Sequence, residues 1–224
     1  MKRSILTIFA VLLTLGVQAQ DDAFGISLKA YSPQAAFNQN VDNTPFGLSF
    51  SYLNRVKDTR FSWGGEFGVA MYSNDSYDIE FGGRPITIDE EDCFFTLHSF
   101  VRYDLVRTQI ATIYSEARLG LTTFFSTTDA REEDTGFRGE FDFHGTAFNT
   151  GVGAGLLVNT GALFSKERVR NRTYIDMAVN VHSGSRARYR MLPEGQGMHT
   201  LDDGNFTSLT HYVGYRLGVV IEFD

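Results

Sequence analysis

The sequence predicts an all-β fold, an eight-stranded antiparallel up-and-down transmembrane β-barrel. Three observations predict it: a long alternation of bulky and small residues at the C-terminal end, seven more segments with the same alternation, and connections that alternate in length. Alternation with period two is typical of strands with two unlike faces. An even number of strands joined by alternately short and long connections is typical of barrels that span a membrane.

The first nineteen residues have the pattern of a secretory signal peptide. Lys2 and Arg3 precede an apolar stretch from Ile5 to Val17, and a small residue, Ala19, offers a cleavage position. The apolar stretch is short for a transmembrane anchor, which is the weaker alternative. We therefore expect a signal peptide at residues 1–19 and one exported barrel domain at residues 20–224.

Eight candidate strands follow, each with one bulky face. Their approximate spans are Ala23–Tyr31, Phe46–Val56, Arg60–Tyr72, Phe94–Val106, Thr112–Phe125, Ala147–Val158, Thr173–Ser183 and Thr207–Phe223. The last span is nearly three times as long as an ordinary strand of about 5–6 residues. A tilted membrane-spanning strand of about 9–11 residues that continues into a loop explains this length. In this strand His211 and Leu217 belong to the bulky, lipid-facing set.

The predicted connections alternate between short and long. Residues 57–59 and 107–111 form short connections, and 159–172 an intermediate one, whereas the connections 31–46, 73–93, 126–146 and 184–206 are long. Short turns are expected in the periplasm and long loops outside the cell. Aromatic residues near strand ends are expected to form interfacial girdles, namely Phe61, Tyr72, Phe94, Phe125, Phe148, Tyr174 and Phe223.

A soluble, lipocalin-like periplasmic barrel is the structural alternative, because it alternates too. A solvated surface would carry many Lys and Glu residues, whereas the minor face here is mostly glycine and serine, as at Ser62, Gly64 and Gly68. Small residues suit the inside of a narrow barrel. The glycines at 151, 153 and 155 share one strand face and lack the context of a nucleotide-binding loop, so we expect no cofactor there.

Ionisable residues on the minor face are expected to fill the lumen. They are Lys29, Glu66, His98, Arg102, Glu116, Arg118, Asp176, His182 and Arg216. The interior of an eight-stranded barrel is just wide enough for side chains to fill it. Since an unpaired buried charge is costly, these groups are expected to pair across the lumen as a structural plug, with a gated ion path or a binding site as the alternative.

Composition excludes some classes of protein and partner. The net charge is −7 and the mean hydropathy is −0.17, which argue against a nucleic-acid partner and against a bundle of apolar helices. Cys93 is the only cysteine, so no intramolecular disulfide can form, and it follows an acidic run in a segment expected to be a loop.

The C-terminal end resembles the recognition signal of bacterial outer-membrane barrels, a polar residue and glycine followed by hydrophobic residues and a terminal aromatic. It is carried by Arg216, Gly218, Ile221 and Phe223, although Asp224 follows the aromatic residue. With the strand count and the loop alternation, the chain resembles the small OmpA-barrel and OmpX type, often labelled porin-like. The resemblance implies an outer-membrane location and contact with the barrel-assembly machinery, and it transfers no catalytic residue.

Three hypotheses for function remain open. The first is a non-enzymatic barrel whose long loops bind a surface partner or lipopolysaccharide, or whose wall docks into a larger outer-membrane complex. Lipopolysaccharide phosphates could be bound by Arg186, Arg188 and Arg190, and the acidic runs 89–92 and 132–134 could share divalent cations with them. The basic segment 166–170 could dock a partner in the periplasm.

The second hypothesis is a narrow channel for small or hydrophobic solutes, and the third is a lipid A-modifying enzyme. The known deacylase arrangement places Ser two residues after His, and none of the five histidines has it. His211, with Tyr215 four residues later, is the remaining candidate. We therefore predict no catalytic, cofactor-binding or metal-ligating residues.

Overall fold

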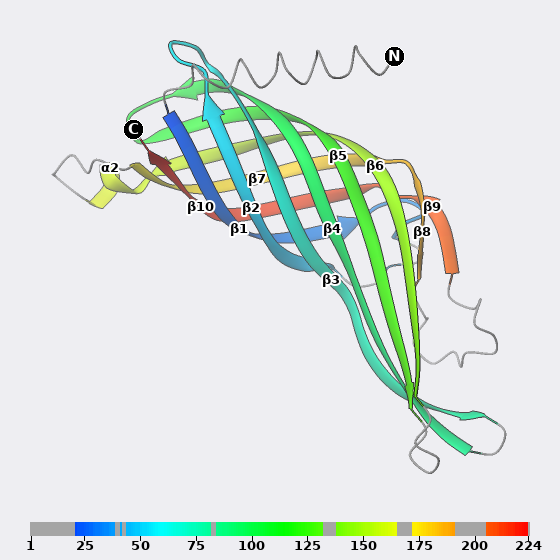
Figure 1. Cartoon of the computed structure of the whole chain (residues 1–224). Helices are drawn as coiled ribbons and strands as arrows, with labels where there is room; N and C mark the ends of the chain where they lie inside the picture. The colour runs from blue at the N-terminus through cyan, green and yellow to red at the C-terminus, as the bar shows by residue number, and fades with distance from the viewer. Residues whose placement is uncertain are drawn as a thin grey trace, which may run out of the picture.

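The computed structural model describes residues 21–38, 41, 44–81, 84–131, 138–164, 172–190 and 205–223. Eight strands close into an antiparallel barrel in the order β1-β10-β7-β6-β5-β4-β3-β2, and β8 and β9 form a separate two-stranded sheet (Figure 1). The barrel closes where β1 pairs with β10, with Leu28 opposite Leu217. The predicted eight-stranded up-and-down barrel is therefore confirmed.

The elements of the barrel have the following bounds: β1 Asp21–Pro33, β2 Phe46–Arg55, β3 Phe61–Phe81, β4 Arg84–Arg107, β5 Ala111–Arg131, β6 Arg138–Asn159, β7 Arg172–Gly184 and β10 Tyr212–Phe223. Outside the barrel sheet lie α2 Thr160–Phe164, β8 Arg186–Arg190 and β9 Asn205–Leu209. The predicted signal peptide lies outside the described residues.

Two of the predicted long loops are largely strand, so that part of the prediction is wrong. Strands β3 to β6 run on past the barrel as a four-stranded sheet extension, made of residues 73–81, 84–92, 126–131 and 138–146 (Figure 1). A bulge between Met71 and Ser73 marks the point where β3 enters it. The short turns and the paired residues Asp22 and Phe223 lie at the opposite end, so the sheet extension belongs to the extracellular side.

The predicted strand Thr207–Phe223 is two strands. Residues 205–209 form β9 and pair with β8. Strand conformation is interrupted at Thr210 and His211, and β10 begins at Tyr212. At the break, the backbone oxygen of His211 accepts a hydrogen bond of 2.8 Å from the amide of Gln34. His211 is partly exposed there and lies outside the barrel strands, so its predicted lipid-facing position stays a prediction.

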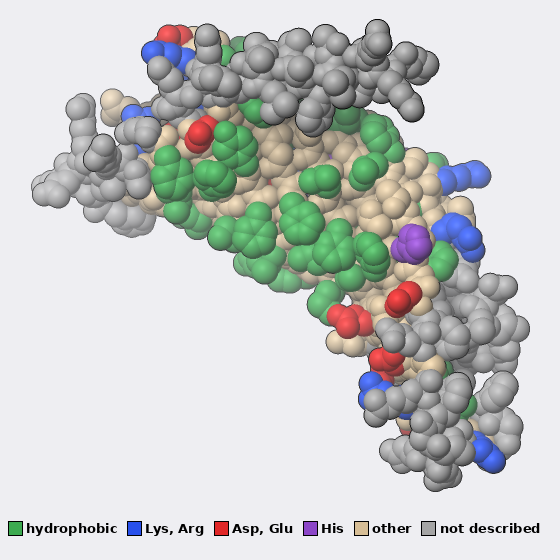
Figure 2. Space-filling view, viewed as in Figure 1, with side chains coloured by type: hydrophobic (Ala, Val, Ile, Leu, Met, Phe, Trp, Pro, Cys, Tyr) green, Lys and Arg blue, Asp and Glu red, His purple; other side chains and the backbone are tan. Residues whose placement is uncertain are grey.

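A belt of exposed apolar side chains surrounds the barrel, and Figure 2 shows one face of it. Leu97 and Val152 are 61% and 64% exposed, and Phe24, Ile26, Phe50, Val101, Leu119, Val181 and Leu217 are also among the exposed members. A closed barrel with an apolar outer belt and a polar interior is the architecture of an outer-membrane β-barrel. The chain is such a barrel, and the apolar belt is its lipid-facing surface.

The aromatic girdle is smaller than predicted. Phe61, Phe125, Phe148 and Phe223 point outward as expected, whereas Tyr72, Phe94 and Tyr174 are buried inside the barrel. Phe94 and Tyr174 have inward parity in their strands, and Tyr72 is the extra residue of the bulge. Separately, none of the helices among the described residues is long and apolar enough to cross a membrane.

Candidate functional site

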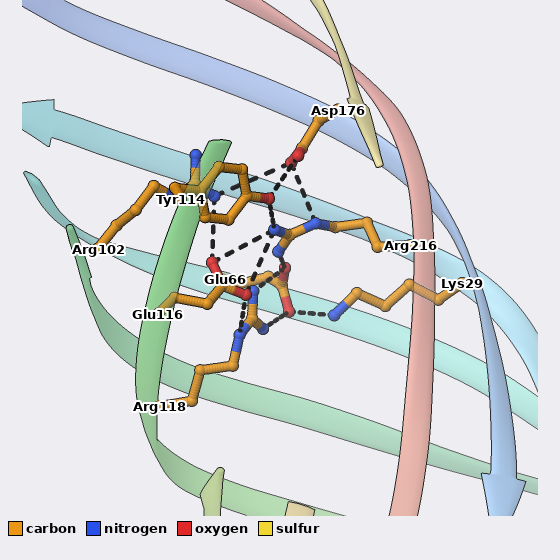
Figure 3. Close-up of polar contacts among 8 residues, drawn as sticks. All are labelled: Lys29, Glu66, Arg102, Tyr114, Glu116, Arg118, Asp176 and Arg216. Carbon is orange, nitrogen blue, oxygen red and sulfur yellow. Dashed lines mark hydrogen bonds and ion pairs between the residues drawn. The ribbon is translucent and has the colours of Figure 1, made fainter. Parts of the chain in front are cut away.

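All nine ionisable residues that were expected in the lumen lie inside the barrel and are buried. Seven of them join in ion pairs, together with the hydroxyl group of Tyr114 (Figure 3). We call these eight residues the ion network: Lys29, Glu66, Arg102, Tyr114, Glu116, Arg118, Asp176 and Arg216. The remaining two, His98 and His182, lie next to the network and take no part in its ion pairs.

Glu66 on β3 is the centre of the ion network. Its Oε1 accepts from Lys29 Nζ on β1 and, at 2.7 Å, from Arg118 Nη1 on β5. Its Oε2 accepts from Arg216 Nη1 on β10 at 3.1 Å. Burial of one carboxylate is costly, and three cations from three strands offset that cost.

Glu116 on β5 is the second shared acceptor. Arg118 Nε donates to its Oε1 at 2.8 Å, while Arg102 Nη2 and Arg216 Nη2 lie 3.2 and 3.3 Å from its Oε2. Arg216 therefore contacts both glutamates and links β10 to β3 and β5 across the lumen. An arginine suits this position because its planar fork donates in several directions at once.

Tyr114 and Asp176 complete the network on the periplasmic side. The hydroxyl of Tyr114 donates to Asp176 Oδ1 at 2.5 Å and accepts from Arg216 Nη2 at 2.7 Å. Gly155 makes this possible, since a Cβ there would lie 2.3 Å from the Tyr114 hydroxyl oxygen. Sequence reasoning missed Tyr114, although it has the same strand parity as Glu116 and Arg118.

Arg102 lies closer to an aromatic ring than the other cations of the ion network do. Its guanidinium lies 3.8 Å from the ring centre of Tyr114 and 5.6 Å from that of Phe100, within the range of cation–π contacts. Its Nε and Nη1 atoms have no hydrogen-bond partner among the described residues. The ion network thus holds four cations against three carboxylates, with aromatic faces next to the fourth cation.

Apolar layers close the lumen on both sides of the ion network. Toward the outside, the segment after β1 folds into the barrel, and the ring of Phe37 lies 5.7 Å from that of Phe124. We call this the aromatic plug: Tyr31, Phe37, Val41, Tyr72, Phe94, Phe124 and Tyr212. Toward the periplasm lies a second layer that contains Phe100, Leu157, Tyr174 and Val220.

Two further carboxylates at the periplasmic end were not anticipated. Glu222 accepts from Arg55 Nη1 at 2.5 Å and from the Tyr174 hydroxyl at 2.8 Å, and Asp104 pairs with Arg107. Both carboxylates have the inward parity of their strands, which is the signal that could have found them. Glu222 thus links β10 to β2 and β7, whereas Asp104 pairs within β4, just before the turn.

The loop candidates have mixed outcomes. Arg186 and Arg188 are exposed on β8, where the Arg188 guanidinium lies 5.4 Å from the Phe143 ring centre, and the side chain of Arg190 lies outside the described set. Residues 89–92 are not a loop: they alternate along β4, so that Glu91 is exposed while Asp92 is buried and accepts from Ser126 Oγ. Cys93 is likewise a half-buried strand residue. Segments 132–134 and 166–170 fall outside the described residues.

The residues of the C-terminal signal have structural positions of their own. Arg216 belongs to the ion network, and Gly218 packs against β1, where a Cβ would lie 2.1 Å from Ser27 Oγ. Ile221 and Phe223 point outward, and the Phe223 ring lies 5.9 Å from that of Phe24.

Comparison with known proteins gives similarities to solved structures. No protein-family model matches the chain, and no curated protein sequence matches it. It is similar to Ail, the attachment invasion locus protein of Yersinia pestis, with 13% identity, a TM-score of 0.46 and coverage of 92% of this chain and 99% of that one. Neisserial surface protein A gives 9% identity, a TM-score of 0.46 and coverage of 91% and 95%.

The N-terminal β-barrel domain of OprF from Pseudomonas aeruginosa is a third similar structure. It gives 12% identity, a TM-score of 0.38 and coverage of 90% of this chain and 97% of that domain.

Proposed function

We propose that the chain is a non-enzymatic outer-membrane protein that binds a partner outside the cell through its sheet extension. The observation that carries this proposal is the contrast between a closed lumen and a projecting sheet. Four strands of 21 to 24 residues continue well past the apolar belt, whereas the barrel interior is filled by the aromatic plug and the ion network. A rigid scaffold that presents an exposed surface to the outside is suited to binding.

The charge of the sheet extension favours a cationic partner. Its strands carry ten Asp and Glu residues against three Arg residues. Asp78, Glu91 and Asp142 are exposed, and Asp89 and Asp129 are partly so. A surface of one sign attracts ligands of the opposite sign and raises their association rate, an effect that salt weakens.

The exposed Arg186 and Arg188 fit a separate role on the same side of the molecule. Guanidinium groups bind phosphates through paired hydrogen bonds, so these two residues are proposed to contact lipopolysaccharide beside the sheet extension. Assembly by the barrel-assembly machinery through Arg216, Gly218, Ile221 and Phe223 remains a prediction, as does docking of the wall into a larger complex.

A channel is supported less well, because a solute would have to displace the aromatic plug and break the ion pairs of Glu66 and Glu116. A lipid A-modifying enzyme is supported less well too, because its one candidate, His211, lies outside the barrel strands, in the connection between β9 and β10.

Binding to the protein in nanodiscs tests the proposal, with lysine-rich and glutamate-rich extended peptides as probes. We expect the cationic peptides to bind, more weakly at high salt, and the Asp78→Asn, Glu91→Gln, Asp142→Asn triple variant to lose most of this binding. A matched triple variant, Arg84→Gln, Arg131→Gln, Arg186→Gln, should keep or increase it. Equal binding of both peptide classes, or conductance of the wild type in planar bilayers that Glu116→Gln alters, would contradict the proposal.

A further inference from the structure

Two histidines face each other in the lumen between the ion network and the aromatic plug. The ring centres of His98 on β4 and His182 on β7 are 5.1 Å apart, and the rings are inclined by 43°. The side chains are only 3% and 4% exposed. Among the described residues, both ring nitrogens of His98 and the Nδ1 of His182 have no hydrogen-bond partner. Buried polar groups in native proteins are nearly always satisfied, so these nitrogens indicate a ligand between or beside the rings.

The spacing of the rings suits a shared metal ion. Zinc lies about 2.0–2.1 Å from an imidazole nitrogen, and so roughly 3.2 Å from the centre of the ring. Two imidazoles at adjacent corners of a tetrahedron then have ring centres roughly 5.2 Å apart. The observed separation of 5.1 Å agrees with this value.

Glycines on the neighbouring strands allow the two rings to approach the barrel wall closely. A Cβ on Gly151 would lie 2.8 Å from His182 Nδ1, so any larger residue there would collide with this donor atom. A Cβ on Gly120 would lie 2.6 Å from His98 Cδ2. Both imidazole positions therefore depend on glycine in β5 and β6.

Asn149 is a further buried polar residue near the two histidines in the barrel wall. It lies on β6, two residues before Gly151, and its ladder partners are Gly120 and Gly184. Its side chain is fully buried: Nδ2 donates to Thr122 Oγ1 at 2.5 Å, while Oδ1 has no partner among the described residues and lies against Gly184, where a Cβ would be 2.3 Å away.

The ring of His182 packs against an aromatic neighbour that holds its orientation. It stacks on the ring of Tyr212, with centres 4.5 Å apart and planes inclined by 20°. No group of three His, Cys, Asp or Glu side chains converges in the described part of the chain, so the donor set consists of the two imidazoles.

We propose that His98 and His182 together bind one late first-row transition-metal ion, Cu²⁺, Ni²⁺ or Zn²⁺. Imidazole suits these metals, whereas Ca²⁺ and Mg²⁺ prefer carboxylate oxygens. The nearby carboxylates of Glu66 and Glu116 are already held by Lys29 and the arginines. The bound ion would join β4 and β7 across the lumen.

Metal content and stability test the proposal on protein that carries a tag without histidine. The chain is refolded into detergent with or without Zn²⁺, Ni²⁺ or Cu²⁺, dialysed, and measured by elemental mass spectrometry. We expect about one ion per chain, because a closed site is loaded as the barrel folds. Metal at about 100 times the dissociation constant should lower the unfolding equilibrium constant about 100-fold.

The variants His98→Gln and His182→Gln should lose both effects. The matched control His144→Gln, on the exposed face of the sheet extension, should keep them. Folding of each variant is checked by the heat-dependent shift of its gel mobility.

The Cu²⁺-loaded wild type provides a readout that needs no variant, since its electron paramagnetic resonance spectrum should show coupling to two imidazole nitrogens. Metal content equal to that of the histidine variants, or a spectrum without nitrogen coupling, would overturn the assignment and leave ordered water as the occupant of the layer.

Discussion

The same four strands, β3 to β6, pass through two different regions of the molecule. In the barrel, their outward side chains are apolar, for example Leu97, Leu121 and Val152. In the sheet extension, the outward positions of the same ladders hold Glu91, Thr127 and Asp142. The backbone pairing between β5 and β6 continues without a register shift through both regions.

This difference shows that the lipid boundary along these strands follows the type of outward side chain rather than the end of the strand. The hydrogen-bonded ladder satisfies the backbone in lipid and in water alike, so it can cross the boundary. The bulge at Met71 and Ser73 lies at this boundary on β3 and changes which residues face outward. We therefore expect substitutions in the barrel to act on stability, and those in the sheet extension to act on binding.

The largest expected effect follows from removing the centre of the ion network. Glu66→Ala leaves Lys29, Arg118 and Arg216 without their shared acceptor, and loss of one partner of a buried ion pair costs about 3–5 kcal/mol. We expect a decrease of this size in the free energy of unfolding, measured by urea titration in lipid vesicles. Glu91→Ala in the sheet extension is the control and should change it by no more than about 0.5 kcal/mol. Equal losses in the two variants would show that the carboxylate of Glu66 is not specially placed.

The next effect concerns the lipid-facing wall. Leu217 lies near the middle of β10 and is 52% exposed, so Leu217→Arg should cost about 2–4 kcal/mol in the bilayer. Thr127→Arg, an outward substitution of the same kind on the sheet extension, should be nearly neutral because water solvates it. Urea titration in vesicles compares the two, and a nearly neutral Leu217→Arg would place this residue outside the lipid.

Accessibility of single cysteines locates the boundary directly, in a Cys93→Ser background. Leu121→Cys should react with a lipid-soluble thiol reagent and resist an aqueous one, while Thr127→Cys should react rapidly with the aqueous reagent. The two positions share one face of β5 and are six residues apart. Similar aqueous labelling of both positions would show that the lipid boundary lies closer to the periplasmic end of the barrel than Leu121.

The barrel itself could be predicted from the sequence because the alternation of inward and outward side chains is visible within each strand. Strand parity placed Glu66, Arg118 and Arg216 in one lumen, since a closed barrel of eight strands leaves inward side chains nowhere else to go. The parity rule also holds for Tyr114 and Glu222, which the prediction did not include.

The sheet extension and the break before β10 could not be predicted in the same way. The prediction required a long bulky face, and the alternation within residues 73–92 is short. It covers Tyr77, Ile79 and Phe81 and then Ile86 and Ile88, with two glycines between them and the acidic run 89–92 after them. At Thr210 and His211 the alternation continues unbroken, and only the pairing of β9 with β8 diverts the chain. Likewise, the contact between the rings of His98 and His182 depends on how β4 and β7 are placed across the lumen. A local sequence pattern does not specify that placement.

The smallest expected effect on stability is also the clearest sign that the two regions are distinct. The double variant Glu91→Gln, Asp142→Asn removes two exposed charges, and such changes usually alter the free energy of unfolding by less than about 0.5 kcal/mol. Because the same charges attract a cationic ligand, the association rate of a lysine-rich peptide should fall, and its dependence on salt should weaken. Stopped-flow binding to nanodiscs, alongside urea titration, measures both quantities on one protein. A loss of stability without a change in association rate would mean that these carboxylates support the fold of the sheet extension rather than its recognition of a partner.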